Sequence, residues 1–169
     1  TSMTAVVSGA SIQEMKGERV LQIIGTAGMD HISINQNGNG RLKVHWDFLC
    51  DDPREFQLDD VDRILAILCD GDDHLTVAGK IELPTLIDAG GGNDHVKGGG
   101  GSDIILGGSG EDDLIGGTGR DILIGGAGVD TIVGGPDEDI ITGNRYQDAS
   151  ASTEDVLDNC DSLLAIQHR

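Results

Sequence analysis

The sequence predicts an all-β protein in which short strands stack into a solenoid. Glycine supplies 27 of the 169 residues, whereas aromatic side chains make up 2 % and hydrophobic side chains 37 %. Ile, Leu and Val must therefore form the core, and β-branched side chains pack well on pleated strands. Acidic, glycine-rich chains are often disordered. Here the aliphatic residues recur at a fixed spacing, which argues against permanent disorder.

The spacing comes from a tandem nine-residue repeat over residues 89–142. Six units follow one another without a gap: AGGGNDHVK, GGGGSDIIL, GGSGEDDLI, GGTGRDILI, GGAGVDTIV and GGPDEDIIT. The sixth place holds Asp94, Asp103, Asp112, Asp121, Asp130 and Asp139, and the eighth holds Val96, Ile105, Leu114, Leu123, Ile132 and Ile141. The last unit is imperfect, since Pro136 and Asp137 stand at the third and fourth places of the GGxG turn, where the fourth is usually glycine. A decayed seventh unit follows, with Asp148 in register.

Each unit contains a turn, a carboxylate and a strand. Glycine tolerates positive φ, so GGxG can fold a tight turn whose carbonyl groups face one way. The aspartate follows this turn, and the last three residues form a short strand with the eighth residue on one face. Two units make one flattened coil, and successive coils stack at about 4.8 Å. Units two apart therefore lie directly over each other.

Stacked turns of this kind predict calcium sites. Calcium takes oxygen ligands at about 2.3–2.6 Å, whereas magnesium demands a smaller octahedron and keeps its waters. The alternative is a solenoid in which the aspartates only cap turns, but stacked carboxylates would then repel by roughly 1–4 kcal/mol per pair. The predicted ligands are the six repeat aspartates, Asp88, Asp148, and the turn residues Gly90, Gly92, Gly99, Gly101, Gly108, Gly110, Gly117, Gly119, Gly126 and Gly128.

This pattern resembles the RTX, or haemolysin-type, calcium-binding nonapeptide GGxGxDxUx. The resemblance closely covers residues 89–142, about a third of the chain, and six tandem matches make it specific. It implies a right-handed parallel β-roll with several Ca²⁺ ions between consecutive turns on both edges. It also implies export from a bacterium, so that the protein would be extracellular or on the cell surface.

Residues 1–88 carry diluted copies of the same pattern. GTAGMDHIS (25–33) and Gly71–Thr76 keep the G-x-D-x-U core. Asp30 and Asp73 are candidate calcium ligands, but without a complete neighbouring turn we interpret them as structural turn residues. We expect an irregular β-solenoid that caps the open end of the repeats. Its expected strands are Val20–Ile24, Arg41–Phe48 after an NGNG turn, Arg63–Cys69 and Thr85–Ile87.

We expect three regions: the cap (1–88), the calcium-binding repeats (89–148) and a short C-terminal amphipathic helix (149–169). Ser152 followed by Glu154 and Asp155 is a helix-start signal. The residues that then recur at helical spacing are Val156, Leu157, Cys160, Leu163 and Leu164.

The outward-facing side chains of units two, four and six predict a hydrophobic sheet face, here called the apolar plate. Its members are Ile104, Leu106, Ile122, Ile124, Ile140 and Thr142. A surface of that size is rarely left facing water. We expect the C-terminal helix to cover it, and the competing prediction is a protein partner or self-association.

Composition argues against several other partners and compartments. With 30 acidic and 11 basic residues the formal net charge is −19, which repels nucleic acid and anionic membranes. No apolar run approaches the roughly 20 residues that span a bilayer. We identify no signal-peptide pattern, and we interpret Thr1-Ser2-Met3 as a cloning remnant before a fragment of a larger protein, so that this says little about export. Three cysteines (Cys50, Cys69 and Cys160) are too few for a disulfide framework, and a Cys50–Cys69 bridge competes with buried thiols.

Three histidines, His31, His74 and His95, follow the turn aspartate directly. If their strands stack, the imidazoles would line up on one sheet face and could bind zinc or nickel. The simpler interpretation is an exposed strand position, where Thr131 is equally acceptable.

The sequence contains no catalytic constellation: GxSxG, HExxH and a Walker loop are all missing, so we expect no enzyme. It favours a calcium-binding module of a secreted bacterial protein that folds when calcium binds outside the cell. A second hypothesis is an adhesion or surface-interaction module that binds through the apolar plate. A third, part of a polysaccharide-active β-helix enzyme, would need aromatic residues for sugar stacking, and these are scarce.

Overall fold

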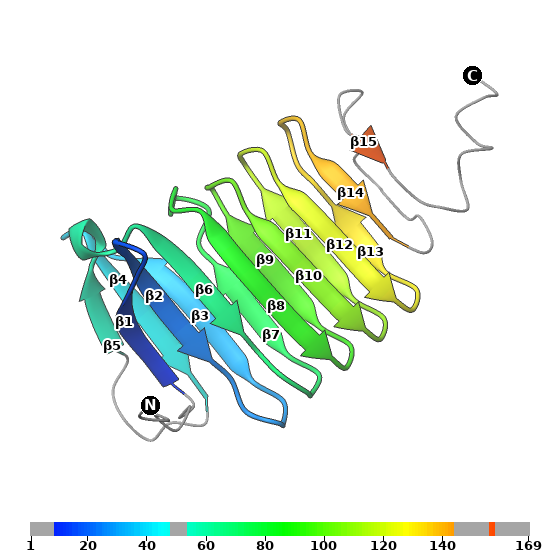
Figure 1. The fold of residues 1–169 in the computed structure, drawn as a ribbon, viewed down its shortest axis with the longest axis horizontal. Coiled ribbons are helices and arrows are strands. Elements are labelled where there is room, and N and C mark those ends of the chain that lie inside the picture. The colour runs from blue at the N-terminus through cyan, green and yellow to red at the C-terminus, as the bar shows by residue number, and fades with distance from the viewer. Residues whose placement is uncertain (1–8, 48–53, 144–155, 158–169) are drawn as a thin grey trace.

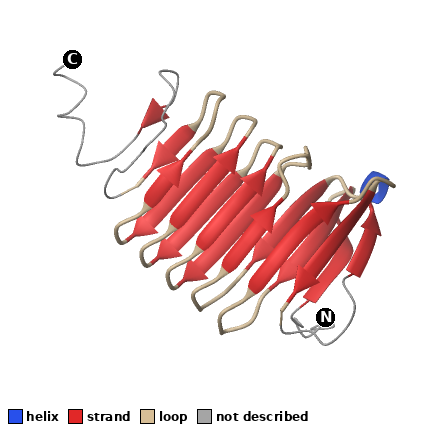
Figure 2. Ribbon diagram, turned by 180° about the vertical axis from the view of Figure 1, so that it is seen from behind, coloured by secondary structure: helices blue, strands red, loops and turns tan. Residues whose placement is uncertain are grey.

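The protein is an all-β solenoid of about four turns, flattened between two sheets (Figures 1 and 2). The computed structural model describes residues 9–47, 54–143 and 156–157. The first sheet contains, in order, β1 (Gly9–Met15), β2 (Glu18–Ile24), β6 (Arg63–Ile67), β8 (Thr85–Gly91), β10 (Ile104–Ser109), β12 (Ile122–Ala127), β14 (Ile140–Thr142) and β15 (Val156–Leu157). The second contains β13 (Thr131–Val133), β11 (Asp113–Gly117), β9 (His95–Gly99), β7 (His74–Val77), β3 (His31–Gln36), β4 (Arg41–Trp46) and β5 (Arg54–Gln57). A short 3₁₀ turn, η1 (Leu58–Asp60), precedes β6.

Consecutive repeat units alternate between the two sheets, as the nine-residue period predicts. Leu123 of β12 pairs with Ile105 of β10, and Leu114 of β11 pairs with Val96 of β9, both in parallel register. Every such pair joins residues two units apart. The prediction that two units form one coil is therefore confirmed.

The eighth residue of each unit fills the space between the sheets. The side chains of Val96, Ile105, Leu114 and Leu123 have no exposed surface. They belong to one continuous core that extends from Ala10 to Ile141. Because the strand alternates inward and outward side chains, this single aliphatic row closes the interior of the repeat coils.

The capping end differs from the repeats in its strand direction. β1 pairs with β2 antiparallel, and β4 pairs antiparallel with both β3 and β5. Lys16 and Gly17, with φ of 54° and 85°, form the two-residue turn that a tight hairpin requires. The predicted strands at β2, β4, β6 and β8 are confirmed, whereas β1 and β5 carry too weak a pattern to be predicted.

The structure shows a strand, not the expected C-terminal helix, at the two residues of this segment that it describes. Val156 and Leu157 form β15, which pairs in parallel with Ile140 and Ile141 of β14. The edge of β14 offers backbone groups for pairing, and that pairing favours a strand over a helix at these two residues. The rest of the predicted helix lies outside the described residues. No helix of bilayer-spanning length and hydropathy occurs in the described part of the chain.

Candidate metal-binding edges

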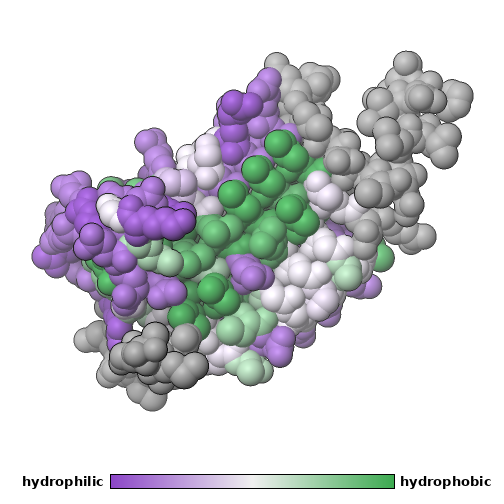
Figure 3. Space-filling model, viewed as in Figure 1, coloured by the Kyte–Doolittle hydropathy of each residue, from purple (hydrophilic) through white to green (hydrophobic). Residues whose placement is uncertain are grey.

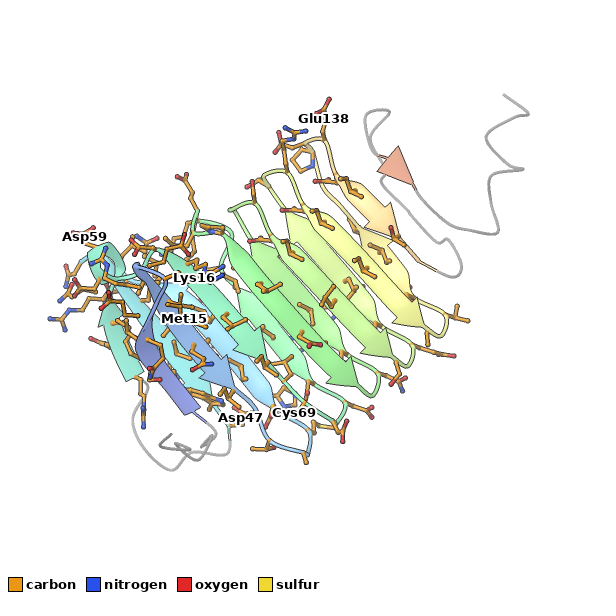
Figure 4. The ribbon with its side chains drawn as sticks, in the orientation of Figure 1. Met15, Lys16, Asp47, Asp59, Cys69 and Glu138 are labelled. Atoms are coloured by element: carbon orange, nitrogen blue, oxygen red, sulfur yellow. The ribbon has the colours of Figure 1, made fainter. Side chains whose placement is uncertain are left out.

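The sixth-place residues of successive coils form two rows, one along each long edge of the solenoid. The first row contains Asp30, Asp73, Asp94, Asp112 and Asp130, and the second contains Thr85, Asp103, Asp121 and Asp139. Every aspartate in these rows is only 1–2 % exposed. Figure 4 shows the two edges through their neighbours, with Cys69 beside the first row and Glu138 beside the second.

A hydrogen-bond ladder connects the members of each row. The Oδ1 atom of an aspartate accepts the backbone N–H of the row residue one coil earlier. Donor–acceptor distances are 2.7–3.1 Å along the first row and 2.8 Å at each step of the second. This ladder fixes each carboxylate against the neighbouring turn, so the orientation of the aspartates is built into the backbone stacking.

The second carboxylate oxygen has no such partner. Among the described residues, buried Oδ2 atoms without a hydrogen-bond donor belong to Asp73, Asp94, Asp103, Asp112, Asp121 and Asp130. A buried oxygen that carries charge and has no donor costs on the order of 1–3 kcal/mol or more. One such atom would be a local defect, but a repeated series at equivalent places indicates that something else satisfies it.

Electrostatics lead to the same conclusion. Burial raises the pKa of Asp103 and Asp112 to about 6 and that of Asp121 to about 7. For Asp112 the neighbouring charges of Asp94 and Asp130 raise the pKa further. Without a cation, burial therefore makes the carboxylate form of these side chains harder to maintain, so they take up protons at higher pH than an ordinary aspartate does.

Backbone oxygen atoms of the glycine turns lie along the same edges. A Cβ on Gly108 would meet the carbonyl group of Gly90, and a Cβ on Gly110 would meet that of Gly92. Both residues have positive φ, 113° and 133°, which glycine alone adopts without strain. The turns can therefore stack closely enough to aim the carbonyl oxygen of one coil at the next.

The donor set fits calcium better than a transition metal. No group of three or more His, Cys, Asp or Glu side chains in the described ranges is placed to hold a metal ion. A cation at these edges would therefore need backbone carbonyl groups beside one or two carboxylates. Six to eight mixed carboxylate and carbonyl oxygens are the ligands that calcium takes. The carboxylates of the two rows and the backbone carbonyl groups of the glycine turns would hold the calcium ion.

The structure places most predicted ligands on the two edges. The ten predicted glycines all lie in or beside the corner turns, and nine of them have φ between 100° and 138°, Gly101 being the exception. Asp88 lies apart from both rows, since its exposed side chain is on β8 in register with Leu106. Asp148 lies outside the described residues.

The sequence does not place Asp73 or Thr85 in the two rows: it predicts Asp73 as a structural turn residue and Thr85 as the start of a strand. Asp73 shares the buried row with the repeat aspartates although its unit is incomplete. Thr85 occupies the sixth place of the second row, where its N–H donates to Asp103 Oδ1 at 2.8 Å. The G-x-D-H string shared by residues 28–31 and 71–74 was the available signal for Asp73.

The three histidines stack on the outer face of the second sheet, as predicted. The ring centroids of His31 and His74 are 5.7 Å apart, and those of His74 and His95 are 4.6 Å apart. Nδ1 of His95 lies 2.8 Å from Oδ2 of Asp113. Stacked rings do not direct their nitrogens at one point, and the structure therefore gives no support to a zinc or nickel site here.

The apolar plate is present on the outer face of the first sheet (Figure 3). Its most exposed members are Ile104, Ile124 and Ile140, at 39 %, 37 % and 46 %. Strand register continues the column of seventh-place residues through Leu86 to Leu65 in the capping part. The plate is thus longer than the repeat alone predicts.

Comparison with known families matches two segments, residues 86–114 and 115–145, to the model of the RTX calcium-binding nonapeptide repeat. No curated protein and no solved structure matches the chain at the significance required. The family match begins within β8 and covers the regular coils, and strands β1 to β7 lie outside it.

Proposed function

The chain carries the RTX calcium-binding nonapeptide repeat, and we propose that it is a calcium-responsive β-roll module of a secreted bacterial protein. Calcium binding and the β-solenoid fit this repeat family. The proposal goes beyond the family match in two respects: calcium binding is coupled to folding, and the protein acts outside the cell.

One observation supports the proposal above all: the repeated buried Oδ2 atoms that have no hydrogen-bond donor. When bound, calcium would supply the positively charged partner that these oxygens otherwise lack. The aspartates orient one carboxylate oxygen through the ladder and leave the other for the cation. Because the glycines carry no side chain, the carbonyl group of one turn lies against the next turn, where it would contribute an oxygen ligand.

Calcium binding would then be linked to folding of the repeats. At low calcium the buried carboxylates disfavour the stacked turns, and glycine keeps the chain conformationally free. Extracellular calcium modules have dissociation constants of about 10⁻⁴–10⁻³ M. Each occupied site stabilises the fold by RT ln(1 + [L]/Kd), and stacking of neighbours makes the sites cooperative. Such a module would leave the cell unfolded and fold outside.

Circular dichroism tests this coupling. After thorough chelation the far-UV β-sheet signal is expected to fall, and added calcium chloride is expected to restore it. Magnesium chloride at the same concentration serves as the control and is expected to restore much less, because magnesium retains its waters. An unchanged β-sheet signal in chelated protein would contradict calcium-dependent folding.

A second candidate function is interaction with another protein chain through the apolar plate. The exposed Ile104, Ile124 and Ile140 favour it, because an uncovered aliphatic surface tends to associate. Size-exclusion chromatography with light scattering, with and without calcium, tests for self-association. Ile122→Lys should abolish a dimer formed through the plate, whereas a monomer under all conditions would argue against self-association.

A further inference from the structure

We propose that the first row binds one calcium ion more than the repeat units predict, held between the turn that ends at Asp73 and the first repeat turn, which ends at Asp94. The inference rests on the proposed function, because it extends the same row of sites. Residues 69–73 lie outside the segments that match the repeat family.

The strands on either side place this turn directly on the repeat stack. β7 pairs with β9 in parallel, with His74 opposite His95 and Leu75 opposite Val96. This is the register that joins β9 to β11 inside the repeat. The sequence separation from Asp73 to Asp94 is 21 residues instead of 18, because a longer loop bulges between β7 and β8. The extra residues leave the stacking at the first edge unchanged.

Asp73 has the environment of a repeat aspartate. Its side chain is 2 % exposed, and its backbone N–H donates to Asp94 Oδ1 at 2.8 Å, as the N–H of Asp94 does to Asp112 at 2.9 Å. Its own Oδ1 accepts the N–H of Asp30 at 2.7 Å. Its Oδ2 is buried without a donor. The side chain thus presents an oxygen that requires a cation.

The glycine of this turn matches as well. Gly71 has φ of 133°, the value found at Gly110 in the middle of the repeat. A Cβ on Gly92 would meet the carbonyl group of Gly71, as one on Gly110 would meet that of Gly92. Asp70 and Asp72 add two exposed carboxylates to the same turn. The turn therefore offers the carbonyl and carboxylate oxygens of a repeat corner, with more negative charge.

The row of cation-requiring oxygens ends at Asp73. Both carboxylate oxygens of Asp30, one coil earlier, already have hydrogen-bond donors in their own turn. The N–H of Thr26 donates to Asp30 Oδ2 at 2.6 Å, and the Thr26 hydroxyl donates to Asp30 Oδ1 at 2.9 Å. The second row ends sooner, since Thr85 takes the place of an aspartate. The proposal therefore adds one site on one edge and none on the other.

The test counts calcium ions per full chain by native mass spectrometry, after chelation and titration with calcium chloride. Asp73→Asn preserves the size of the side chain and removes its charge, and it is expected to bind one ion fewer than the wild type. Asp59→Asn is the matched control, because its exposed carboxylate lies at the far end of the molecule (Figure 4). It is expected to bind as many ions as the wild type.

An equal count in Asp73→Asn and wild type would overturn this inference and leave the proposed function intact. No bound ion in the wild type would overturn both. If the fluorescence of Trp46 indicates that Asp73→Asn is unfolded, crystals of the wild type grown in calcium decide. Anomalous density for calcium between Asp73 and the turn before Asp94 would support the site, and a water molecule there would overturn it.

Discussion

The capping part and the repeat part of this solenoid share one core but differ in what stabilises them. Among the described residues, sixteen buried hydrophobic side chains lie before Thr85, and eight lie from Ile87 onward. The capping part also has hairpins that close its ends and few buried charges. The repeat part replaces bulky side chains with glycine and buries six aspartates.

This difference shows how a thin core can be sufficient. One aliphatic side chain per nine residues buries little apolar surface, and roughly 25 cal/mol per Å² of it must offset the entropy of fixing flexible glycines. The buried carboxylates oppose folding further. Cations between the turns would reverse the sign of that electrostatic contribution. The repeat part should therefore depend on calcium far more than the capping part.

The largest expected effect is that calcium removal unfolds the repeat part and leaves the capping part folded. Trp46 is the only tryptophan and is buried in β4 of the capping part, so its fluorescence reports on that part alone. In chelator the far-UV β-sheet signal should fall while Trp46 emission stays that of a buried indole. A simultaneous loss of both signals would mean that the two parts fold as one unit.

A smaller but still large effect is expected from Gly110→Ala. At φ of 133° a side chain is strained by about 1–3 kcal/mol, and the new Cβ would also meet the backbone of Gly92. The thermal midpoint in calcium should fall for the repeat part and remain unchanged for Trp46. Gly38→Ala is the control, because a Cβ there meets no atom within 4 Å. Equal midpoints for both variants would contradict close stacking of the turns.

The effect of Asp121→Asn on the stability of the repeat part should change sign between calcium and chelator. The amide keeps an Oδ1 acceptor for the N–H of Asp103 but removes a ligand charge, so calcium affinity should fall about tenfold, roughly 1.4 kcal/mol. In chelator the same change removes a buried charge and should leave the repeat part equally or more stable. Calcium titrations and urea unfolding of the variant measure the two effects. Destabilisation in both conditions would contradict a cation-binding role.

The smallest expected effect concerns pH. Burial raises the pKa of Asp103 and Asp112 to about 6 and of Asp121 to about 7, above the ordinary value of 3.8. Groups with raised folded pKa values stabilise the fold at low pH, and this contribution is lost as pH rises through 6 to 7. Metal-free protein should therefore show more β-structure at pH 5 than at pH 8. The reverse order in circular dichroism would contradict the burial of these aspartates.

The regular period explains why so much was predictable from sequence. Nine-residue spacing determines register, so Asp112 and Asp121 could be assigned to opposite edges and Ile105 and Leu114 to the core. Asp73 could not be assigned in this way, because 21 residues separate it from Asp94 and a period of nine no longer counts the coils. Only the strand pairing of His74 with His95 reveals the equivalence.

Other features depend on contacts that no period encodes. The hairpin of β1 and β2 follows from the turn at Lys16 and Gly17, a local signal that the glycine-rich background obscures. Val156 and Leu157 fit a helical pattern, but pairing with β14 favours the strand. Asp88 continues the acidic pattern in sequence, yet alternation along β8 places it on the outer face.

Isothermal titration of calcium into the thoroughly chelated 169-residue chain tests the central claim most directly. If the two aspartate rows require cations, the titration will show saturable, cooperative uptake of several ions per chain, and magnesium will not reproduce it. A chain that takes up no calcium at millimolar concentration, while keeping its β-structure, would contradict the account.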